Sequence, residues 1–310
     1  MSFAMVSMAV GVIATDSLPV ILSGTGTATV NNAGPSLTGT AINDGGAWVT
    51  NLDVDPIEYY FYVNVSDANT LDDIAQVTLE MWVNANQGAD NPTYRYKFQY
   101  TETTPNDGSF AGTWSQLYPT TGTYFNNANC LTPVATTSNS GSYVFAMTLH
   151  KTAKAGTWNY NATTTDSTPV KATASTKTFN VYKHLDMTYD TGGGSQNFAW
   201  TASIGAQNIA DTFDITVTSN APYTFSAAYE NRFYNATSGT TWSNEPSLDI
   251  KYGTGLVYSV TNVTASYTQW CSFLSPVLSQ TTSHTLYLDF ESVLPALVYT
   301  GVIIYIQATV

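Results

Sequence analysis

The amino-acid sequence predicts an all-β protein with two immunoglobulin-like β-sandwich domains, preceded by an apolar N-terminal strand. Short apolar or alternating segments are separated by Gly, Pro, Asn and Asp, which is the pattern of sandwich strands and their turns. No long segment shows the helical period of about 3.6 residues. A length of 310 residues allows two domains, and a hydrophobic content of 43% allows each of them a core.

The N-terminal segment is apolar and carries no charge before Asp16. A secretory signal begins with positive charge, but the first Lys or Arg in this chain is Arg95. A transmembrane helix needs about 20 apolar residues, and Asp16 and Pro19 interrupt this segment. Gly11 and several β-branched residues also disfavour a helix. We therefore expect a strand.

As a strand, this segment has one bulky apolar face and one face of small residues. An exposed apolar strand promotes aggregation, so it must be buried. It could enter a groove on the next copy of the protein, as in pilin donor-strand complementation, or form the first strand of its own domain. A helical, pilin-like stalk is a third alternative. In the first alternative the polymerisation residues are Val6, Met8, Val10, Val12 and Ile13.

The other strand candidates fall into two groups. Those of the first group are residues 57–66, 75–84, 93–102, 143–150, 156–163 and 176–183. Those of the second group are residues 196–203, 212–219, 223–229, 255–264, 267–273, 284–291 and 299–310. Because the glycine triplet 192–194 breaks the strand pattern between them, the predicted organisation is an apolar strand over residues 1–17, a first sandwich over 18–185 and a second over 186–310.

An acidic segment, Asp67–Ile74, predicts the one short helical turn of the chain. Asn69 or Thr70 could cap this turn, with acidic side chains at its positive end. A calcium site is the alternative, although the spacing is not that of an EF-hand. We predict no metal; the weak candidates for ligands are Asp67, Asp72 and Asp73.

Charge is sparse and negative. Only 10% of the residues are charged, against about 25% in typical soluble domains, and the net charge is −13. Nucleic acid is therefore excluded as a partner, because phosphate binding needs clustered Lys and Arg. We also expect no stable insertion into a membrane. Solubility must come from Thr, Ser and Asn, which is typical of a secreted, extracellular protein.

Two cysteines and four glycosylation sequons fit an extracellular location. Cys130 and Cys271 lack the spacing of a zinc site; they could form a disulfide in an oxidising compartment or remain two buried thiols. The sequons predict N-linked glycans on at least two of their asparagines. These asparagines are Asn64, Asn161, Asn235 and Asn262.

No catalytic constellation is present in the sequence, so we predict that the chain is not an enzyme and needs no cofactor. The three histidines are far apart, and the motifs of hydrolases, metalloproteases and nucleotide-binding proteins are missing. The seven tryptophans could form a sugar-binding surface. The alternative is that Trp82, Trp158 and Trp200 lie on strands and fill cores.

Three segments carry a resemblance to a known class of protein: DANTLDDIAQVTL (67–79), AKAGTWNYNATTTD (153–166) and FNVYK (179–183). They resemble the immunoglobulin-like domains of archaeal cell-surface and extracellular proteins. Together with the N-terminal strand, the chain resembles archaeal surface filament subunits of the thread or donor-strand pilus type. The resemblance implies a structural subunit, on the cell surface, whose partners are other copies of itself.

The sequence therefore favours a subunit that polymerises head to tail by inserting its N-terminal strand into the next copy. A heterologous contact that does not close produces an open polymer. A cell-surface adhesin or surface-layer protein that binds glycans is the first alternative. A pilin-like or archaellin-like subunit with a helical N-terminus is the second, and a secreted hydrolase is a third.

Overall fold

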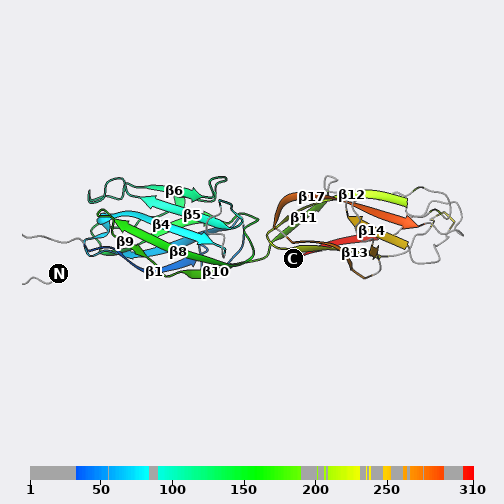
Figure 1. The fold of residues 1–310 in the computed structure, drawn as a ribbon, viewed down its shortest axis with the longest axis horizontal. Coiled ribbons are helices and arrows are strands. Elements are labelled where there is room, and N and C mark those ends of the chain that lie inside the picture. Colours follow the sequence, from blue (N-terminus) through cyan, green and yellow to red (C-terminus); the bar gives the residue numbers. More distant parts are fainter. Residues whose placement is uncertain are drawn as a thin grey trace, which may run out of the picture. The chain divides into compact units, whose positions relative to one another are not determined.

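The computed structural model describes residues 33–54, 56–83, 90–189, 201, 206, 209–230, 235, 237–238, 247–252, 261–263, 266–274, 276–289 and 303–310 (Figure 1). The chain divides into two units, residues 1–32 and residues 33–310, and every described residue belongs to the second. The predicted polymerisation residues Val6, Met8, Val10, Val12 and Ile13 thus lie outside the described residues, as does the glycine triplet 192–194. The fold is all-β, as the sequence predicts.

Ten strands between residues 36 and 181 form two sheets, which make the first sandwich. The smaller sheet has the antiparallel order β1-β3-β7, with strands Ser36–Asn43, Glu58–Ser66 and Ser140–Thr148. The larger has the order β2-β10-β8-β4-β5-β6, and β9 also pairs with β8. In that order its strands are Asn51–Leu52, Lys177–Val181, Gly156–Asp166, Ile74–Trp82, Arg95–Thr101 and Thr113–Tyr118, with β9 at Lys171–Thr173.

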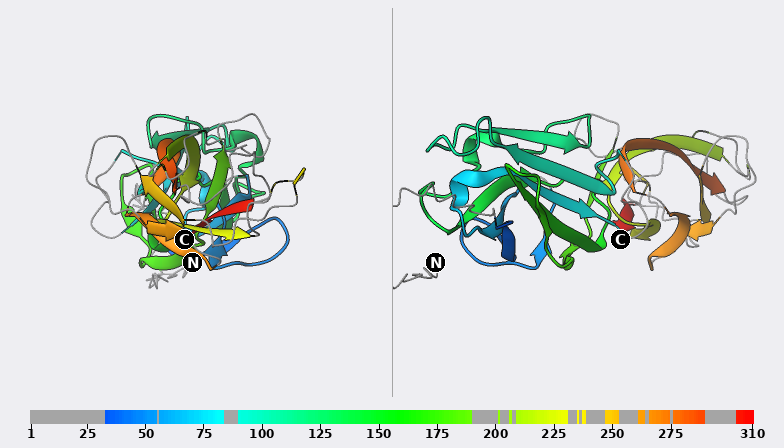
Figure 2. Two further views of the ribbon diagram at one scale, coloured as in Figure 1. Left: turned by 90° about the vertical axis from the view of Figure 1, so that its right-hand side faces the viewer. Right: turned by 60° about the vertical axis from the view of Figure 1, so that its left-hand side comes forward.

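The core of the first sandwich follows from strand alternation. In β3 every second side chain is buried, and Phe61, Val63 and Val65 are completely enclosed. In β8 the residues Trp158, Tyr160 and Ala162 point into the same core. Because side chains at successive positions of a strand lie on opposite faces, the remaining residues of β4, β5 and β8 form a polar outer face. These strands run side by side in Figures 1 and 2.

The last strand of the first sandwich, β10, completes the larger sheet. It pairs antiparallel with β8 over Lys177–Val181 and parallel with the short strand β2. Its inward side chains, Phe179 and Val181, are buried, and Phe179 contacts Phe61, Trp158 and Tyr160. The first sandwich therefore supplies its own final strand, and β10 occupies the edge of β8.

Strands between residues 185 and 309 form a second pair of sheets. One has the order β11-β12-β17-β14-β15, with strands Leu185–Tyr189, Ile209–Ser219, Val277–Asp289, Ser247–Tyr252 and Thr261–Val263. The other has the order β16-β13-β18, with strands Thr268–Phe273, Tyr223–Glu230 and Ile303–Thr309. None of the pairings among the described strands joins these sheets to those of the first sandwich.

The core of this second pair of sheets is smaller. Its buried residues come from β12, β13 and β17, and they enclose His284 between the rings of Phe213 and Phe225. Inward residues of the edge strands β16 and β18, such as Phe273 and Ile306, are only partly buried against it. The predicted division at residues 185 and 186 stays a prediction.

Helical structure among the described residues is limited to two 3₁₀ turns, η1 (Leu71–Asp73) and η3 (Asn127–Asn129). The turn at η1 is confirmed, but its predicted cap is wrong: Thr70 forms no capping hydrogen bond and has a positive φ of 105°. Asp67 instead accepts a hydrogen bond from the backbone N–H of Asn69 (2.7 Å) and closes the bend before the turn. Neither of these described turns has the length or the apolar character of a membrane-spanning helix.

Candidate functional site

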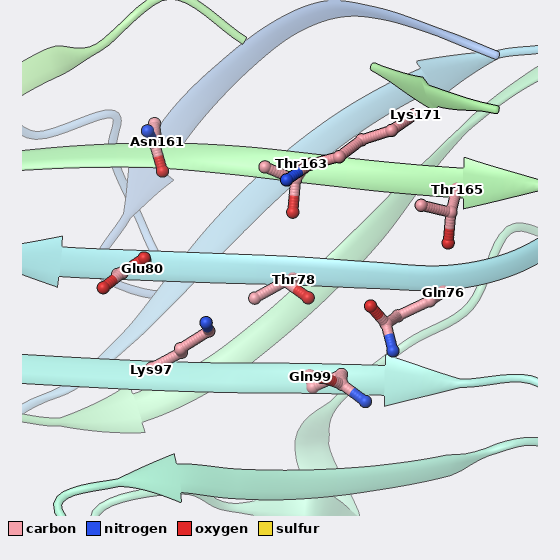
Figure 3. Close-up of a pocket in the computed structure, with 9 residues that line it drawn as sticks. All are labelled: Gln76, Thr78, Glu80, Lys97, Gln99, Asn161, Thr163, Thr165 and Lys171. Atoms are coloured by element: carbon pink, nitrogen blue, oxygen red, sulfur yellow. The ribbon is translucent and has the colours of Figure 1, made fainter. Parts of the chain in front are cut away.

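A polar hollow lies on the outer face of the larger sheet of the first sandwich. The hollow has a volume of about 210 Å³ and opens above β4, β5 and β8. Figure 3 shows that its side chains stand on these three strands, and that Lys171 reaches from β9 across β8 toward Thr163. The residues around the hollow are Gln76, Thr78, Glu80, Lys97, Gln99, Asn161, Thr163, Thr165 and Lys171.

Register explains why these residues meet. Glu80 lies directly opposite Lys97 on β5 and opposite Asn161 on β8. Residues in register on one face have Cβ atoms about 4.5–5.5 Å apart, so outward positions of adjacent strands form rows across the sheet. Thr78 continues the pattern between Gln99 and Thr163. Sequence analysis missed this face because pairing between strands is not visible in the order of the residues.

The carboxylate at the hollow, Glu80, belongs to a neighbouring ion pair. Glu80 accepts hydrogen bonds from Nε (3.0 Å) and Nη2 (2.8 Å) of Arg95, both on Oε1. The guanidinium group of Arg95 also lies over the ring of Tyr118, 3.9 Å from its centroid. Glu80 is the one carboxylate among the residues around the hollow, so the pair of carboxylates that glycoside hydrolysis uses is not assembled here. Amides and hydroxyls could instead bind a polar ligand by hydrogen bonds.

The tryptophans of the first sandwich do not form a broad binding platform. Trp158 is completely buried in the first core, which confirms its interpretation as a core residue. Trp82 is also buried, but alternation along β4 places it on the outer face with Glu80, and it is not part of the core cluster. Trp200 lies outside the described residues. Trp48 is 65% exposed and packs edge-on against Tyr62, with ring centroids 5.0 Å apart.

Three of the four sequon asparagines have side chains that the structure describes, and none of these three is fully exposed. Asn64 on β3 and Asn161 on β8 are half-buried, and Asn64 Oδ1 accepts a hydrogen bond from Ser142 (2.6 Å). Asn235 is buried, and its Oδ1 accepts a hydrogen bond from the backbone N–H of Ser238 (2.6 Å). Asn262 belongs to β15. Glycosylation at these positions stays a prediction.

The two cysteines are free thiols in the structure, so the disulfide considered from the sequence is not formed. Each belongs to a separate core. Cys130 is buried in the first core, and its Sγ accepts a hydrogen bond from the backbone N–H of Ala146 (3.4 Å). Cys271 packs partly buried against the second core. Burial raises the pKa of the Cys130 thiol to about 11 and that of Cys271 to about 12.

Two of the three weak candidates for metal ligands do come together. Asp67 and Asp73 are joined by Asp166 at the end of β8, and each of the three offers an oxygen that lies within 4.8 Å of the others. Asp72 does not take part, because its carboxylate accepts a hydrogen bond from the backbone N–H of Gly108. Sequence analysis missed Asp166, which is far away along the chain. The β4–β8 register places it opposite Ile74, next to Asp73.

Comparison with known proteins gives a likeness of fold only. No family model matches the chain, and no curated protein matches it. Among solved structures, a chain described under "Chaperone-tip adhesin complex is vital for synergistic activation of CFA/I fimbriae biogenesis" is 13% identical, with 77% of this chain and 76% of that chain covered and a TM-score of 0.37.

Two further solved structures are similar at the same level. The adhesive subunit CfaE of the CFA/I fimbria of enterotoxigenic Escherichia coli is 10% identical, over 72% of this chain and 70% of that chain, with a TM-score of 0.36. A chain of the CsuC–CsuE chaperone–tip subunit complex of Acinetobacter baumannii is 10% identical, over 84% and 97%, with a TM-score of 0.30. None of these comparisons indicates an archaeal source for the chain.

Proposed function

We propose that this chain is the structural subunit of an extracellular surface filament, and that copies join head to tail through the N-terminal apolar strand. The proposal assigns it no catalytic activity and no cofactor. It rests on the apolar sequence of residues 1–17 and on the buried core of the first sandwich. The polymer would consist of identical copies.

The observation that carries the proposal is that the described strands of the first sandwich already bury its core. These strands, from β1 to β10, lie within residues 36–181. The final strand β10 covers the edge of β8, and the core residues on both sheets are buried. We infer that the apolar N-terminal strand is buried in a groove of another copy, because a strand of this kind must be covered and the described strands already cover this core.

The second pair of sheets is the better acceptor. Inward residues of its edge strands β16 and β18 are only partly buried, in contrast to those of β10 in the first sandwich. Leu274, which directly follows β16, is 84% exposed. A strand added beside β16 or β18 would cover these apolar residues and gain main-chain hydrogen bonds along an edge that no other described strand occupies.

The energy of such a joint is large. Burying each of Val6, Met8, Val10 and Val12 would contribute about 1.5–3 kcal/mol. The main-chain ladder adds to this, while ordering the strand opposes it. A contact of this kind is heterologous, so repetition produces an open filament rather than a closed ring.

Electron microscopy and sedimentation of the full chain test the proposal, beside a chain that lacks residues 1–16. We expect filaments from the full chain and monomers from the truncated one. Val10→Asp should abolish filaments, because it places a charge on the bulky face, whereas the matched control Val10→Leu should retain them. Near-ultraviolet circular dichroism checks that every variant is folded.

Monodisperse particles from both the full and the truncated chain would contradict the proposal and favour the glycan-binding adhesin. The polar hollow on the larger sheet is the observation that supports this second candidate. Its amides, hydroxyls and two lysines could bind a sugar by hydrogen bonds. Binding of the monomer to a glycan array, lost on substitution of Gln99 and Thr163, would then identify the hollow as the site.

A further inference from the structure

Three buried carboxylates meet at one end of the first sandwich. Asp67 follows the last residue of β3, Asp73 ends the turn η1, and Asp166 is the last residue of β8. Their exposed fractions are only 2%, 3% and 2%. One oxygen from each lies within 4.8 Å of the other two. Both sheets of the sandwich therefore contribute to this acidic cluster.

Part of the hydrogen-bonding capacity of the cluster is already used. Asp73 Oδ1 accepts hydrogen bonds from Asn106 Nδ2 (2.8 Å) and from the hydroxyl of Ser167. Asp166 Oδ1 accepts them from the backbone N–H groups of Thr168 (3.0 Å) and Val170 (2.9 Å). These bonds fix the carboxylates in position, so the cluster does not depend on mobile surface side chains.

One oxygen of the cluster lacks any hydrogen-bond partner. Asp67 Oδ1 accepts the N–H of Asn69, but Asp67 Oδ2 is fully buried and accepts no hydrogen bond within the described part of the chain. Nor do Asp67 and Asp73 form ion pairs with any described Lys, Arg or His. A buried carboxylate oxygen without a partner is costly, and buried polar atoms of native proteins almost always have one. The described residues therefore leave this oxygen without a partner.

Two partners could satisfy this oxygen: a proton or a cation. Burial, followed by the negative charges of Asp73 and Asp166, raises the pKa of Asp67. A proton would neutralise one carboxylate and would still leave the other two close together. A divalent cation would offset two of the three negative charges and could contact all three carboxylates.

We propose that Asp67, Asp73 and Asp166 bind a divalent cation, with Ca²⁺ as the preferred ion. The cluster offers only oxygen atoms, which hard cations prefer. Two ligands on opposite sides of Ca²⁺ are about 4.6–5.2 Å apart, because Ca–O distances are about 2.3–2.6 Å. The carboxylate oxygens all lie within 4.8 Å of one another, which is close enough for one Ca²⁺ ion to contact all three. The Ser167 hydroxyl and water would supply further oxygens.

A cation at this position would connect the two sheets. Asp67 continues the central strand β3 of the smaller sheet, while Asp166 ends the central strand β8 of the larger one. Binding would therefore hold the turn η1 against both sheets and stabilise the sandwich as a whole. The inference is independent of the proposed filament, since it concerns the interior of a single sandwich.

Calorimetric titration of the full chain with Ca²⁺, after treatment with EGTA, tests the inference. We expect one site per chain and a rise of several degrees in the thermal unfolding midpoint on addition of about 10 mM Ca²⁺, which exceeds the dissociation constants of extracellular modules. Asp166→Asn should reduce the affinity by at least about tenfold. The matched control is Asp72→Asn, which alters the neighbouring carboxylate outside the cluster and should leave the affinity unchanged.

Absence of binding heat and of any shift in the unfolding midpoint at this Ca²⁺ concentration would overturn the inference, and a proton would then be the partner of Asp67. Equal affinity in Asp166→Asn and the wild type would overturn it as well, because the cation would lie elsewhere. If Asp166→Asn does not fold, Asp67→Asn replaces it. Its amide oxygen can still accept the N–H of Asn69, so the turn is preserved while the charge is lost.

Discussion

Replacing Trp158 by alanine should destabilise the first sandwich more than any surface substitution. Trp158 lies on the central strand β8 and is completely buried. Its ring is stacked on Phe179, with centroids 6.0 Å apart, and is tilted against Tyr96 at 5.7 Å. Its indole N–H donates a hydrogen bond to the carbonyl oxygen of Lys154 (2.7 Å). Alanine removes all of these contacts at once.

The magnitude follows from the buried area and the lost hydrogen bond. A buried tryptophan removes about 150–250 Å² from water. At about 25 cal/mol per Å² this area corresponds to about 4–6 kcal/mol, an upper limit because the unfolded chain already buries some of it. We expect Trp158→Ala to lower the free energy of unfolding by about 3–5 kcal/mol. Trp158→Phe keeps a ring but leaves the Lys154 carbonyl without its donor, which should cost about 1–3 kcal/mol.

Urea unfolding of the full chain, followed by near-ultraviolet circular dichroism and tryptophan fluorescence, measures these differences. The alanine variant should unfold at much lower urea, with the phenylalanine variant between it and the wild type. A loss below about 1.5 kcal/mol for Trp158→Ala would refute the reasoning, because a fully enclosed ring of this size cannot be removed so cheaply from a close-packed core.

Three further predictions concern buried titratable groups. Burial lowers the pKa of His284 to about 4, so between about pH 6.5 and pH 4 the unfolded chain binds a proton that the folded chain does not. The free energy of unfolding should therefore be highest above about pH 6.5 and fall by about 3 kcal/mol as the pH decreases to about 4. His284→Gln should remove this loss, as measured by urea unfolding at several pH values. Because burial raises the thiol pKa of Cys130 and Cys271 to about 11 and 12, both should react with a thiol reagent at about pH 8 only after unfolding, and rapid labelling of the native protein would contradict this. Glu80→Gln should cost about 1–3 kcal/mol, since Arg95 keeps an oxygen acceptor but loses the negative charge opposite it, and the side chains of Glu80 and Arg95 are only 15% and 10% exposed. A double-mutant cycle with Arg95→Met that gives no coupling energy would show that the pair does not contribute to stability.

Strands with strong alternation could be predicted from the sequence almost to the residue. The range 57–66 became β3 at Glu58–Ser66, and 223–229 became β13 at Tyr223–Glu230. By contrast, β1 (Ser36–Asn43) and β6 (Thr113–Tyr118) were not predicted. Both lie at sheet edges and expose much of their surface, so they need few large apolar residues and show little of the pattern that reveals a strand.

The cap of the acidic turn shows how tertiary structure changes a local expectation. Asn69 and Thr70 are good capping residues in isolation. In the folded chain the backbone N–H groups of Asp67 and Leu71 donate to the carbonyl oxygens of Asn139 and Ser138, in the segment that precedes β7. These bonds fix the path of the loop, and Thr70 takes a conformation in which its side chain does not cap the turn.

The sequence by itself determined the all-β class, the core positions of the strongly alternating strands and the apolar character of the N-terminal segment, because each depends on residues that are close together in the chain. Only the tertiary structure decided which acidic residues meet. Asp72 and Asp73 are adjacent but diverge, since the turn η1 directs one carboxylate to Gly108 and the other to the cluster. Asp166 joins Asp67 and Asp73 through the register of β4 and β8, and such pairing is set by the packing of a whole sandwich rather than by local sequence.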